Sequence, residues 1–370
     1  MSLILLSAGN STRFNYSVKK QWLRVGNKPL WLFVADNFKE IHNFDRIVVV
    51  ANKDDVLLYE KMSDYLIVSG GEERQFSLKK ALDYVDSEFV MVSDVARACL
   101  DKEVITNILN EKEYDCVVPY LNVVDTVVYK DKTINRDEVK LIQTPQLSKT
   151  KLLKKALNQD TVFTDERAAI ESIQGNIKYI KGSEILNKIT YFKDLKNSCL
   201  KPPSKDYFSG VGYDSHRFEK NKKMYLGGVL IDVDYGFKAY SDGDVVIHSL
   251  IDALLGASGY GDIGDFFPDS DERYKNISSV KLLEKVKDIL SYTGYEIVNI
   301  DITIIAQKPI LKDYKLKIQR NLKSILNTKV NIKATTNEKM GFVGREEGVA
   351  VISNTTLKYK DWYEDCNCRE

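Results

Sequence analysis

The segment Ser198-Cys199-Leu200-Lys201-Pro202-Pro203-Ser204-Lys205-Asp206 divides this sequence into two parts and sets the framework for its fold. Paired prolines are incompatible with a helix interior or a central strand, and they favour an extended spacer. At 370 residues the chain is also longer than one hydrophobic core usually supports. We therefore predict two domains, residues 1–200 and 207–370, joined by a linker at 201–206.

Upstream of this linker, short apolar segments alternate with amphipathic ones. We expect strands at residues 3–6, 46–50, 65–68, 89–92 and 116–119, with helices between them. Alternation of this kind is typical of an α/β fold with a largely parallel, doubly wound, Rossmann-like sheet.

Downstream of the linker the pattern is mixed. Strands are expected at residues 208–212, 295–306, 330–336 and 348–357, and helices at 244–257, 280–292 and 313–326. This order favours a compact α/β (α+β) sandwich of one sheet and its helices.

Composition limits the classes of partner. Lys and Arg number 54 against 53 Asp and Glu, so net charge gives no support to nucleic-acid or anionic-membrane binding. No stretch approaches the ~20 apolar residues that cross a bilayer, and the first residues lack the basic and apolar regions of a signal peptide. The five cysteines are scattered, which favours a reducing, cytoplasmic location, and we assign no role to Cys366-Asn367-Cys368.

Two of the three histidines occur in motifs typical of metal ligands. Asp214 and His216 alternate in Gly212-Tyr213-Asp214-Ser215-His216, so on a strand they project from one face. His248 closes Ser241-Asp242-Gly243-Asp244-Val245-Val246-Ile247-His248, in which the Ser/Asp cluster predicts a helix cap. Three such ligands leave the fourth position of a tetrahedral zinc open, as in catalytic sites. The alternative is that two unrelated histidines serve packing.

The first strand leads directly into Ser7-Ala8-Gly9-Asn10-Ser11-Thr12-Arg13-Phe14, a loop of small residues. Ligands of open α/β sheets bind at the carboxyl ends of the strands, where backbone N–H groups, Arg13 and Lys19-Lys20 could meet a triphosphate. Ser93-Asp94-Val95-Ala96-Arg97 follows the fourth strand and would face the same crevice. A plain turn with exposed basic residues and a salt bridge at the strand end are the competing interpretations.

Two further motifs follow the histidine helix. Gly261-Asp262-Ile263-Gly264-Asp265-Phe266-Phe267-Pro268-Asp269 offers carboxylates to sugar hydroxyls, although a solvated turn has the same composition. Lys333-Ala334-Thr335-Thr336-Asn337-Glu338-Lys339-Met340-Gly341-Phe342-Val343-Gly344-Arg345 combines hydroxyls, a carboxylate and an arginine, which suit a diphosphate with its magnesium.

The amino-terminal motifs together resemble 2-C-methyl-D-erythritol 4-phosphate cytidylyltransferases over nearly all of residues 1–200. The resemblance rests on residues 7–13, Lys20-Gln21, Gly70-Gly71-Glu72-Glu73-Arg74, Asp94-Val95-Ala96-Arg97, Asp125-Thr126, Arg136, Thr144-Pro145-Gln146 and Thr164-Asp165-Glu166. It implies attack of the substrate phosphate on the α-phosphorus of CTP, with magnesium on the nucleotide phosphates and Mn²⁺ as its alternative. Catalytic roles would fall to Arg13, Lys20 and Lys188. The cytidine would be surrounded by Ala8, Gly9, Gly71 and Ser77. The methylerythritol phosphate would be held by Asp94, Arg97, Thr126, Arg136 and Thr144, of which Thr126 and Arg136 would come from a dimer partner.

Three positions depart from that family pattern. Ser11 replaces a loop glycine, Lys19-Lys20-Gln21-Trp22 replaces Pro-Lys-Gln-Tyr, and Asp94-Val95-Ala96-Arg97-Ala98 replaces Asp-Ala-Ala-Arg-Pro. The charged residues are retained. Ser11 raises the question of loop geometry, because glycine adopts positive φ at little cost and serine does not.

The carboxyl-terminal motifs resemble 2-C-methyl-D-erythritol 2,4-cyclodiphosphate synthases over about residues 208–358. The resemblance implies zinc on Asp214, His216 and His248, and magnesium near Glu338. The substrate would be held by Asp262, Gly264 and Asp269 at the erythritol, Thr335, Thr336 and Arg345 at the nucleotide phosphates, and Ala306 and Pro309 at the cytosine. Asp252, one helical turn after His248, is a candidate to orient that imidazole. Tyr240 stands where the family often has histidine.

We therefore predict a bifunctional enzyme of the non-mevalonate isoprenoid pathway that acts on small molecules, with a kinase step between its two reactions. The first family resembles dimers and the second trimers, so one closed particle that satisfies both symmetries contains six chains. Two alternatives remain open. The amino-terminal domain could transfer cytidylyl groups to another sugar or polyol phosphate, and the carboxyl-terminal domain could be a zinc-bound oligomerisation module.

Overall fold

The computed structural model describes residues 1–367, which form two compact units. Of the described residues, the first unit comprises Met1–Pro203 together with Asp361–Asn367, and the second comprises Ser204–Lys360. This division differs from the predicted second domain, which ran to residue 370. The difference has a packing reason: helix α12 (Trp362–Asn367) buries Trp362, only 1% exposed, and hydrogen-bonds to Arg24 of the first unit.

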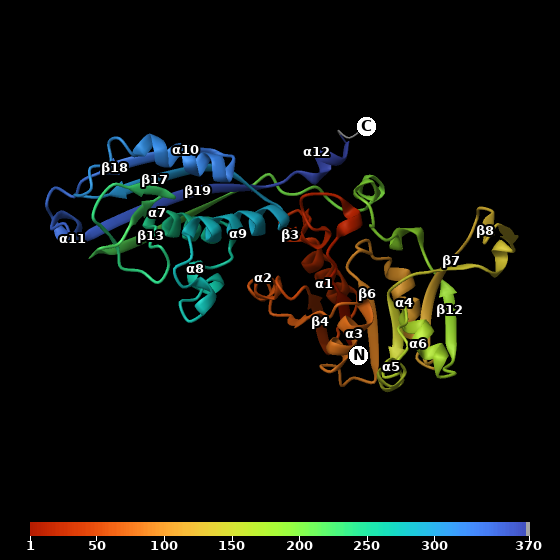
Figure 1. The fold of residues 1–370 in the computed structure, drawn as a ribbon. Coiled ribbons are helices and arrows are strands. Elements are labelled where there is room, and N and C mark those ends of the chain that lie inside the picture. The colour runs from red at the N-terminus through yellow and green to blue at the C-terminus, as the bar shows by residue number, and fades with distance from the viewer. Residues whose placement is uncertain (368–370) are drawn as a thin grey trace. The chain divides into compact units, whose positions relative to one another are not determined.

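The first unit is built on a sheet with the order β10-β7-β11-β6-β1-β4-β5, and β12 pairs with β7 outside this path (Figure 1). Strands β5, β4, β1 and β6 are parallel, whereas β11 runs antiparallel to β6. The strands are β1 Ser2–Leu6, β4 Arg46–Ala51, β5 Leu66–Ser69, β6 Phe89–Asp94, β7 Cys116–Asn122, β10 Lys140–Ile142, β11 Gln146–Lys149 and β12 Ile177–Lys181. The predicted doubly wound sheet is therefore present, with β11 inserted as an antiparallel strand and β10 antiparallel at its edge.

Helices cover both faces of the central strands, as the near-continuous apolar sequence of β4 requires. Helices α3, α5 and α6 enclose one core, to which they contribute Leu78, Leu153 and Ile170. The helices of this unit are α1 Leu30–Ile41, α2 Val56–Glu60, α3 Arg74–Leu82, α4 Lys102–Asn110, α5 Thr150–Leu157, α6 Glu166–Ser172 and α12, with short 3₁₀ turns at η1 Thr12–Phe14, η2 Lys20–Trp22, η3 Arg136–Glu138, η4 Glu184–Leu186 and η5 Phe192–Asn197.

Two small hairpins complete the first unit. One pairs β2 (Arg24–Val25) with β3 (Lys28–Pro29). The other pairs β8 (Val127–Tyr129) with β9 (Lys132–Ile134) and projects from the β7 side of the sheet (Figure 1). The side chains of the second hairpin are largely exposed.

The end of β1 lies beside the end of β6, since Leu6 pairs with Asp94 in parallel register. The chain passes from β1 to β4 on one side and reaches β6 on the other, which makes this edge the switch point of the sheet. Ligand crevices of doubly wound folds form at such points. The fold thus brings the two polar motifs at residues 7–13 and 94–97 together.

The second unit is built on a sheet with the order β16-β13-β19-β17-β18. One face of this sheet, on which Gly210, Thr355, Ile300 and Val330 align, packs against helices. The elements are β13 Tyr207–Lys220, β14 Met224–Leu226, β15 Val229–Ile231, β16 Tyr235–Phe237, α7 Val245–Ser258, α8 Ile263–Phe266, η6 Glu272–Tyr274, α9 Ser279–Tyr292, β17 Tyr295–Ile305, α10 Lys315–Leu326, β18 Lys329–Thr335, α11 Gly341–Gly344 and β19 Gly348–Tyr359.

Two glycines of β13 let α7 approach that strand closely. A Cβ at Gly210 would lie 2.1 Å from the carbonyl oxygen of Ala253, and one at Gly212 would lie 1.9 Å from that of Ser249. The Ser249 hydroxyl donates to the Gly212 carbonyl at 3.1 Å. Since Asp214 and His216 continue the same face of β13, this close packing carries His248 of α7 to them.

The opposite face of the second sheet carries exposed apolar side chains. Tyr207, Val211 and Tyr213 on β13 are 65%, 67% and 55% exposed, and Ile352 on β19 is 41% exposed. Tyr213 and Ile352 are paired in register, so these residues form an apolar strip, which the exposed Ser209 interrupts between Tyr207 and Val211. A strip of this kind is typical of a protein contact surface.

The cysteines differ from the sequence expectation at one pair. Cys99 and Cys199 form a disulfide bond with Cα atoms 5.8 Å apart, although they are 100 residues apart in sequence. Cys116 and Cys366 are free and buried, and Cys368 lies outside the described residues.

Among the helices of the described part of the chain, none has both the length and the apolar character needed to cross a bilayer.

Candidate active sites

A cavity of about 380 Å³ opens at the switch point of the first unit. The loop after β1 supplies Ala8, Gly9 and Arg13, the segment before α3 supplies Gly71, and α3 itself supplies Ser77. Lys20, Asp94 and Lys188 complete the sequence-predicted residues around this cavity. Three separate segments of the chain thus place the cationic side chains of Arg13, Lys20 and Lys188 around one cavity.

The cations around the cavity influence one another. Lys20 Nζ donates to the carbonyl oxygen of Ile189 at 2.8 Å, and the side chain is largely removed from water. Burial lowers the pKa of Lys20 to about 8, and repulsion from Lys188 and Arg13 contributes, against attraction from Asp94. A polyanionic ligand would relieve this repulsion and favour the charged amine.

Asp94 joins two cationic groups below the cavity. Lys188 Nζ donates to Asp94 Oδ2 at 2.5 Å, and Arg74 Nε to Asp94 Oδ1 at 3.3 Å. Arg74 also binds the fully buried Glu166 at 2.7 Å. Burial alone would raise the pKa of Asp94, but Arg74 and Lys188 outweigh it, so this pKa lies below its usual range. Asp94 is therefore a charged anchor for the Lys188 and Arg74 side chains.

Ser11 adopts the left-handed conformation, with φ of 56°, and its side chain binds the neighbouring turn. The Ser11 hydroxyl donates to Gln21 Oε1 at 2.9 Å and accepts from the backbone N–H of Lys20 at 3.1 Å. Gln21 Nε2 donates to the Gly9 carbonyl at 3.0 Å. Positive φ costs a serine of order 1 kcal/mol. The two hydrogen bonds of the Ser11 hydroxyl, which a glycine cannot make, offset that cost.

The other departures in this region share one partner. Lys19 Nζ lies 3.0 and 2.9 Å from the two carboxylate oxygens of Asp55, and Trp22 Nε1 donates to Asp55 Oδ2 at 3.3 Å. Asp55 is 0% exposed. Because Lys19 and Trp22 flank Lys20, one buried carboxylate holds both ends of the turn that carries the Lys20 amine.

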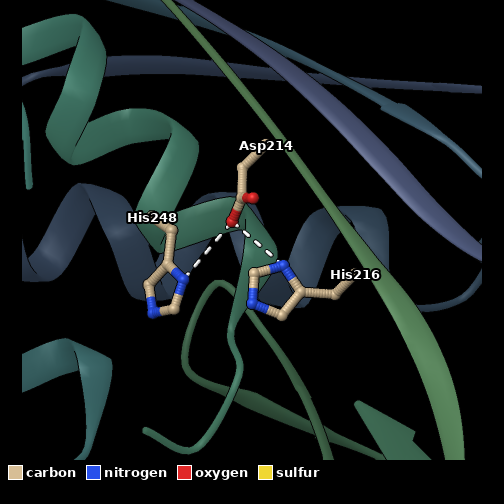
Figure 2. A group of neighbouring side chains, drawn as sticks. All are labelled: Asp214, His216 and His248. Atoms are coloured by element: carbon tan, nitrogen blue, oxygen red, sulfur yellow. Dashed lines mark ion pairs between the residues drawn. The ribbon is translucent and has the colours of Figure 1, made fainter. Parts of the chain in front are cut away.

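Asp214, His216 and His248 of the second unit converge at one point, with potential ligand atoms all within 4.8 Å of one another. Figure 2 shows the Asp214 carboxylate between the two imidazoles, 3.1 Å from His216 Nδ1 and 3.3 Å from His248 Nδ1. Asp214 Oδ2 and His216 Nδ1 are buried and complete no well-aligned hydrogen bond within residues 1–367. Buried lone pairs that face one another in this way fit a bound cation.

The outer nitrogen of His248 is held by two hydroxyls. His248 Nε2 lies 2.9 Å from Ser279 Oγ and 3.1 Å from Ser241 Oγ. The Ser279 hydroxyl itself donates to Asp242 Oδ1 at 2.5 Å. Ser279 Oγ can then accept from Nε2–H, which assigns the tautomer that leaves the Nδ1 lone pair free to bind a metal.

Comparisons with known proteins cover nearly all of the chain. The family model of 2-C-methyl-D-erythritol 4-phosphate cytidylyltransferase matches residues 1–199, and that of the YgbB family matches residues 207–358. The bifunctional enzyme IspD/IspF of Aliarcobacter butzleri is 53% identical over 98% of both chains, and that of Sulfurimonas denitrificans is 52% identical over 98% of this chain and 95% of its own. The solved structure of bifunctional IspDF from Campylobacter jejuni is 48% identical, covers 98% of this chain and 99% of its own, and superposes with a TM-score of 0.85.

The chain belongs to the bifunctional IspD/IspF family. It is therefore an enzyme with two activities in the non-mevalonate isoprenoid pathway. The IspD unit makes CDP-methylerythritol and diphosphate from CTP and 2-C-methyl-D-erythritol 4-phosphate. The IspF unit converts CDP-methylerythritol 2-phosphate to the 2,4-cyclodiphosphate and CMP.

Four predicted residues of the IspD unit do not line the cavity. Arg97 donates to the carbonyls of Leu186 and Ile142 at 2.6 and 3.2 Å, rather than to Asp94. Thr144 is buried, and its hydroxyl accepts from the backbone N–H of Asp94 at 3.3 Å. Arg136 is exposed beside the β8–β9 hairpin and donates to the Val124 carbonyl, and Thr126 directly precedes this hairpin. The prediction that Thr126 and Arg136 serve a partner chain stays open.

The predicted IspF residues fall into two groups. Asp262 caps α8, which contains Gly264, and the Asp252 carboxylate accepts from the backbone N–H of Ile263 at 2.8 Å, which fastens α8 to α7. Asp269 follows α8 and is exposed. Asp252 therefore orients the α8 loop rather than His248, contrary to our hypothesis.

The second group lies at β17 and β18. The Ala306 N–H donates to the Thr335 carbonyl at 2.9 Å, and Pro309 follows Ala306 in the next turn. The Thr336 hydroxyl donates to Glu338 Oε1 at 2.9 Å, and Arg345 pairs with Glu347 at 2.7 Å. None of these side chains belongs to the histidine cluster, which in residues 1–367 contains Asp214, His216 and His248.

Sequence analysis missed the groups that support the sites from outside. Glu166 binds Arg74, which in turn binds Asp94, and Asp55 binds Lys19. Ser279 contacts His248 from the first turn of α9. The motifs that contain Arg74 and Glu166 carry the family resemblance, which implies no role for these two residues. Ser279 carried no local signal, because its contact with His248 spans 31 residues.

Ser279→Ala is expected to weaken metal binding by about 10- to 100-fold, because His248 loses the partner that fixes its tautomer. Competition with a chromophoric chelator would measure the dissociation constant. Ser278→Ala is the matched control, since the neighbouring Ser278 makes no side-chain cap bond to α9. Equal affinities for the two variants would contradict this role of Ser279.

Proposed function

We propose that cytidylyl transfer takes place in the cavity of the IspD unit, with Arg13, Lys20 and Lys188 as the cations that bind and stabilise the phosphates. The convergence of these three side chains on one hollow is the observation that supports this assignment. Ala8, Gly9, Gly71 and Ser77 are the residues around the cytidine. Their small size leaves room for a base and ribose beside the loop.

The methylerythritol phosphate has its own set of residues in this proposal, namely Asp94, Arg97, Thr126, Arg136 and Thr144. Asp94 acts mainly by holding Lys188, to which it is bonded at 2.5 Å. The reaction requires little covalent chemistry from the protein, because phosphoryl transfer depends on positioning and charge stabilisation.

We assign Asp214, His216 and His248 as zinc ligands of the IspF unit. Two imidazoles and one carboxylate fit zinc, and the buried lone pairs described above support the assignment. Glu338 is the residue near magnesium, with manganese as the alternative ion, and magnesium also accompanies CTP in the IspD unit. When bound, such ions polarise phosphate oxygens and neutralise the charge of a leaving group.

The remaining IspF residues fold the substrate for an intramolecular reaction, in which its 2-phosphate attacks the β-phosphorus and CMP leaves. The erythritol hydroxyls are held by Asp262, Gly264 and Asp269. The phosphates are held by Thr335, Thr336 and Arg345, and the cytosine is held by Ala306 and Pro309. Favourable orientation of this kind is worth roughly 7 to 11 kcal/mol. No protein nucleophile is needed.

One chain does not contain the complete IspF site in this proposal. Asp214, Val351, Ile304 and Ala334 are in register across β13, β19, β17 and β18. Three strand spacings, roughly 14 Å, therefore separate the zinc residues from the phosphate residues that follow Ala334. A neighbouring chain that docks on the apolar strip of Tyr207, Val211, Tyr213 and Ile352 would bring the two halves together. Trimers of this unit and dimers of the other give a hexamer.

Mixing two inactive variants tests this arrangement. Asp214→Asn removes one half of the site and Arg345→Ala the other, so hetero-oligomers assembled from both regain cyclase turnover where a wild-type zinc half faces a wild-type phosphate half. Each variant alone stays inactive. Activity that does not rise on mixing, from chains shown to co-assemble, would place both halves in one chain.

The two reactions are separated by a phosphorylation in this proposal. Incubation with CTP, magnesium and 2-C-methyl-D-erythritol 4-phosphate should give diphosphate and a CDP-alcohol in phosphorus NMR spectra, and a cyclic product should form only after a kinase and ATP are added. Unchanged spectra from folded protein would contradict the substrate assignment. We propose a cytoplasmic location for this metabolic enzyme.

A further inference from the structure

Helix α12, at the end of the described chain, contacts three separate segments of the IspD unit. Trp362 Nε1 donates to the Arg24 carbonyl at 2.6 Å. Asp365 Oδ2 accepts from the Tyr16 hydroxyl at 2.5 Å, and Cys366 Sγ lies 3.8 Å from the Phe192 carbonyl. Trp362 and Cys366 are 1% and 5% exposed, so the helix is seated on this unit and not merely close to it.

Each of these three segments carries one of the proposed phosphate-binding cations. Arg24 follows η2, which contains Lys20. Tyr16 follows η1, which contains Arg13, and Phe192 begins η5 soon after Lys188. The attachment points of α12 therefore lie three or four residues from Arg13, Lys20 and Lys188 in the sequence, whose side chains line the cavity.

An aromatic cluster links two of the segments beneath the helix. The rings of Tyr16 and Phe192 are stacked with centroids 4.4 Å apart, and Phe14 meets Phe192 edge-on at 5.7 Å. Phe14 directly follows Arg13 and is 1% exposed. A movement of Tyr16 or Phe192 is thus transmitted to both cationic segments, because the rings pack without free space between them.

We propose that α12 is a positioning element of the cytidylyltransferase site, in which Trp362 and Asp365 fix the spacing of the segments that carry Arg13, Lys20 and Lys188. This inference rests on the roles proposed for those three cations. In the sequence α12 follows the last strand of the IspF unit, β19, so the transferase site is completed by residues that lie beyond the second catalytic unit.

The charges explain why such an element is needed. Lys188 and Arg13 repel the Lys20 amine before a nucleotide binds, and the short 3₁₀ turns that carry Arg13 and Lys20 offer little resistance to that repulsion. A helix bonded to all three segments holds the cations in place around the cavity. The resulting preorganisation is lost when one attachment is removed, while the other contacts keep the fold.

The test uses the full-length chain with Asp365→Ala and, separately, Trp362→Phe. Each variant is expected to lower kcat/KM for CTP by about tenfold, because small displacements of positioning groups have effects of this size. Cyclase turnover of the same samples should be unchanged. Glu364→Ala, which removes the adjacent exposed carboxylate of α12, is the matched control and should leave both activities as they are.

Two readouts separate positioning from a general loss of stability. Segments that relax apart would let the pKa of Lys20 rise from about 8 toward its usual value, so the alkaline limb of kcat/KM moves to higher pH in Asp365→Ala. Asp365→Asn keeps an oxygen acceptor for the Tyr16 hydroxyl. It should therefore restore both the wild-type kcat/KM and the wild-type position of its alkaline limb. Tyr16→Phe should match Asp365→Ala, with no further loss in the double variant.

The inference is overturned if Asp365→Ala and Trp362→Phe keep wild-type kcat/KM and pH profile, or if the loss is proportional to the fraction of unfolded protein. Its failure is distinguishable from failure of the proposed function. Should Lys20→Met retain transferase activity, the cation assignment itself is wrong. If Lys20→Met is inactive while the α12 variants have normal transferase activity, the cation assignment stands and only the positioning role of α12 is rejected.

Discussion

Lys20→Met is expected to lower the cytidylyltransferase kcat/KM by about 10²- to 10³-fold, the usual cost of one preorganised charge at a phosphoryl-transfer site. Methionine retains the length and apolar part of the side chain, so the packing of η2 is preserved. The loss isolates the charge that Lys20 presents to the cavity. A coupled assay for diphosphate measures it.

The pH dependence of the wild-type enzyme should report the same amine. Burial and the neighbouring cations lower the pKa of Lys20 to about 8, so the protonated, phosphate-binding form is lost as pH rises through that value. In kcat/KM, which reflects the free enzyme, activity falls on the alkaline side of about pH 8. In kcat the fall lies at higher pH, because bound phosphates raise the pKa again.

Two variants serve as controls. Lys20→Arg keeps the charge at all accessible pH values and should abolish the alkaline limb while retaining part of the rate. Lys28→Met removes a lysine whose surface ion pair with Asp36 contributes little, and it should behave as wild type. Lys20 would be excluded as the group that titrates near pH 8 if Lys20→Met kept the wild-type kcat/KM, or if Lys20→Arg kept the alkaline fall in activity.

Much of the fold follows from the sequence because its signals are local. Predicted strands at 46–50, 89–92 and 295–306 correspond to β4 Arg46–Ala51, β6 Phe89–Asp94 and β17 Tyr295–Ile305, whose apolar patterns are unambiguous. The strand predicted at 208–212 is longer in the structure, where β13 extends to Lys220. Its second half alternates polar with partly buried residues, so hydrophobicity alone does not mark it as a strand.

The site is less completely predictable because its supports are distant in sequence. Asp214 and His216 share a strand, and a period of two suffices to place them on one face. The partner of Lys19 is Asp55, and the partner of Tyr16 is Asp365, which are 36 and 349 residues away. Such pairs depend on how the elements pack, and no local pattern specifies them.

The departures from the family pattern are also explained only by packing. Ser11 accepts a left-handed backbone because Gln21 and the Lys20 N–H engage its hydroxyl. Lys19 and Trp22 are compatible with each other because both bind Asp55. Taken one at a time these substitutions suggest a weakened loop, whereas together they give the loop and the Lys20 turn a shared set of bonds.

Asp214→Asn is expected to abolish metal binding by the IspF unit and to reduce cyclase turnover on the order of 10³-fold, because metal-assisted charge stabilisation amounts to several kcal/mol. The two side chains have nearly the same shape, so β13 and its glycine contacts with α7 are preserved. The amide, however, lacks the negative charge and can present an N–H to an imidazole Nδ1 only 3.1 or 3.3 Å away. A cluster of facing lone pairs then becomes a hydrogen-bonded cluster with no affinity for a cation.

Asp252→Asn is the informative comparison for this variant. Asp252 lies on α7 close to the cluster but binds the backbone of Ile263, so its replacement should spare the metal and disturb only the α8 loop. Metal content after dialysis would be near wild type in Asp252→Asn and near zero in Asp214→Asn, while the transferase rate is normal in both. Full metal content in Asp214→Asn would mean that the two histidines bind without the carboxylate, and the three-ligand assignment would have to be abandoned.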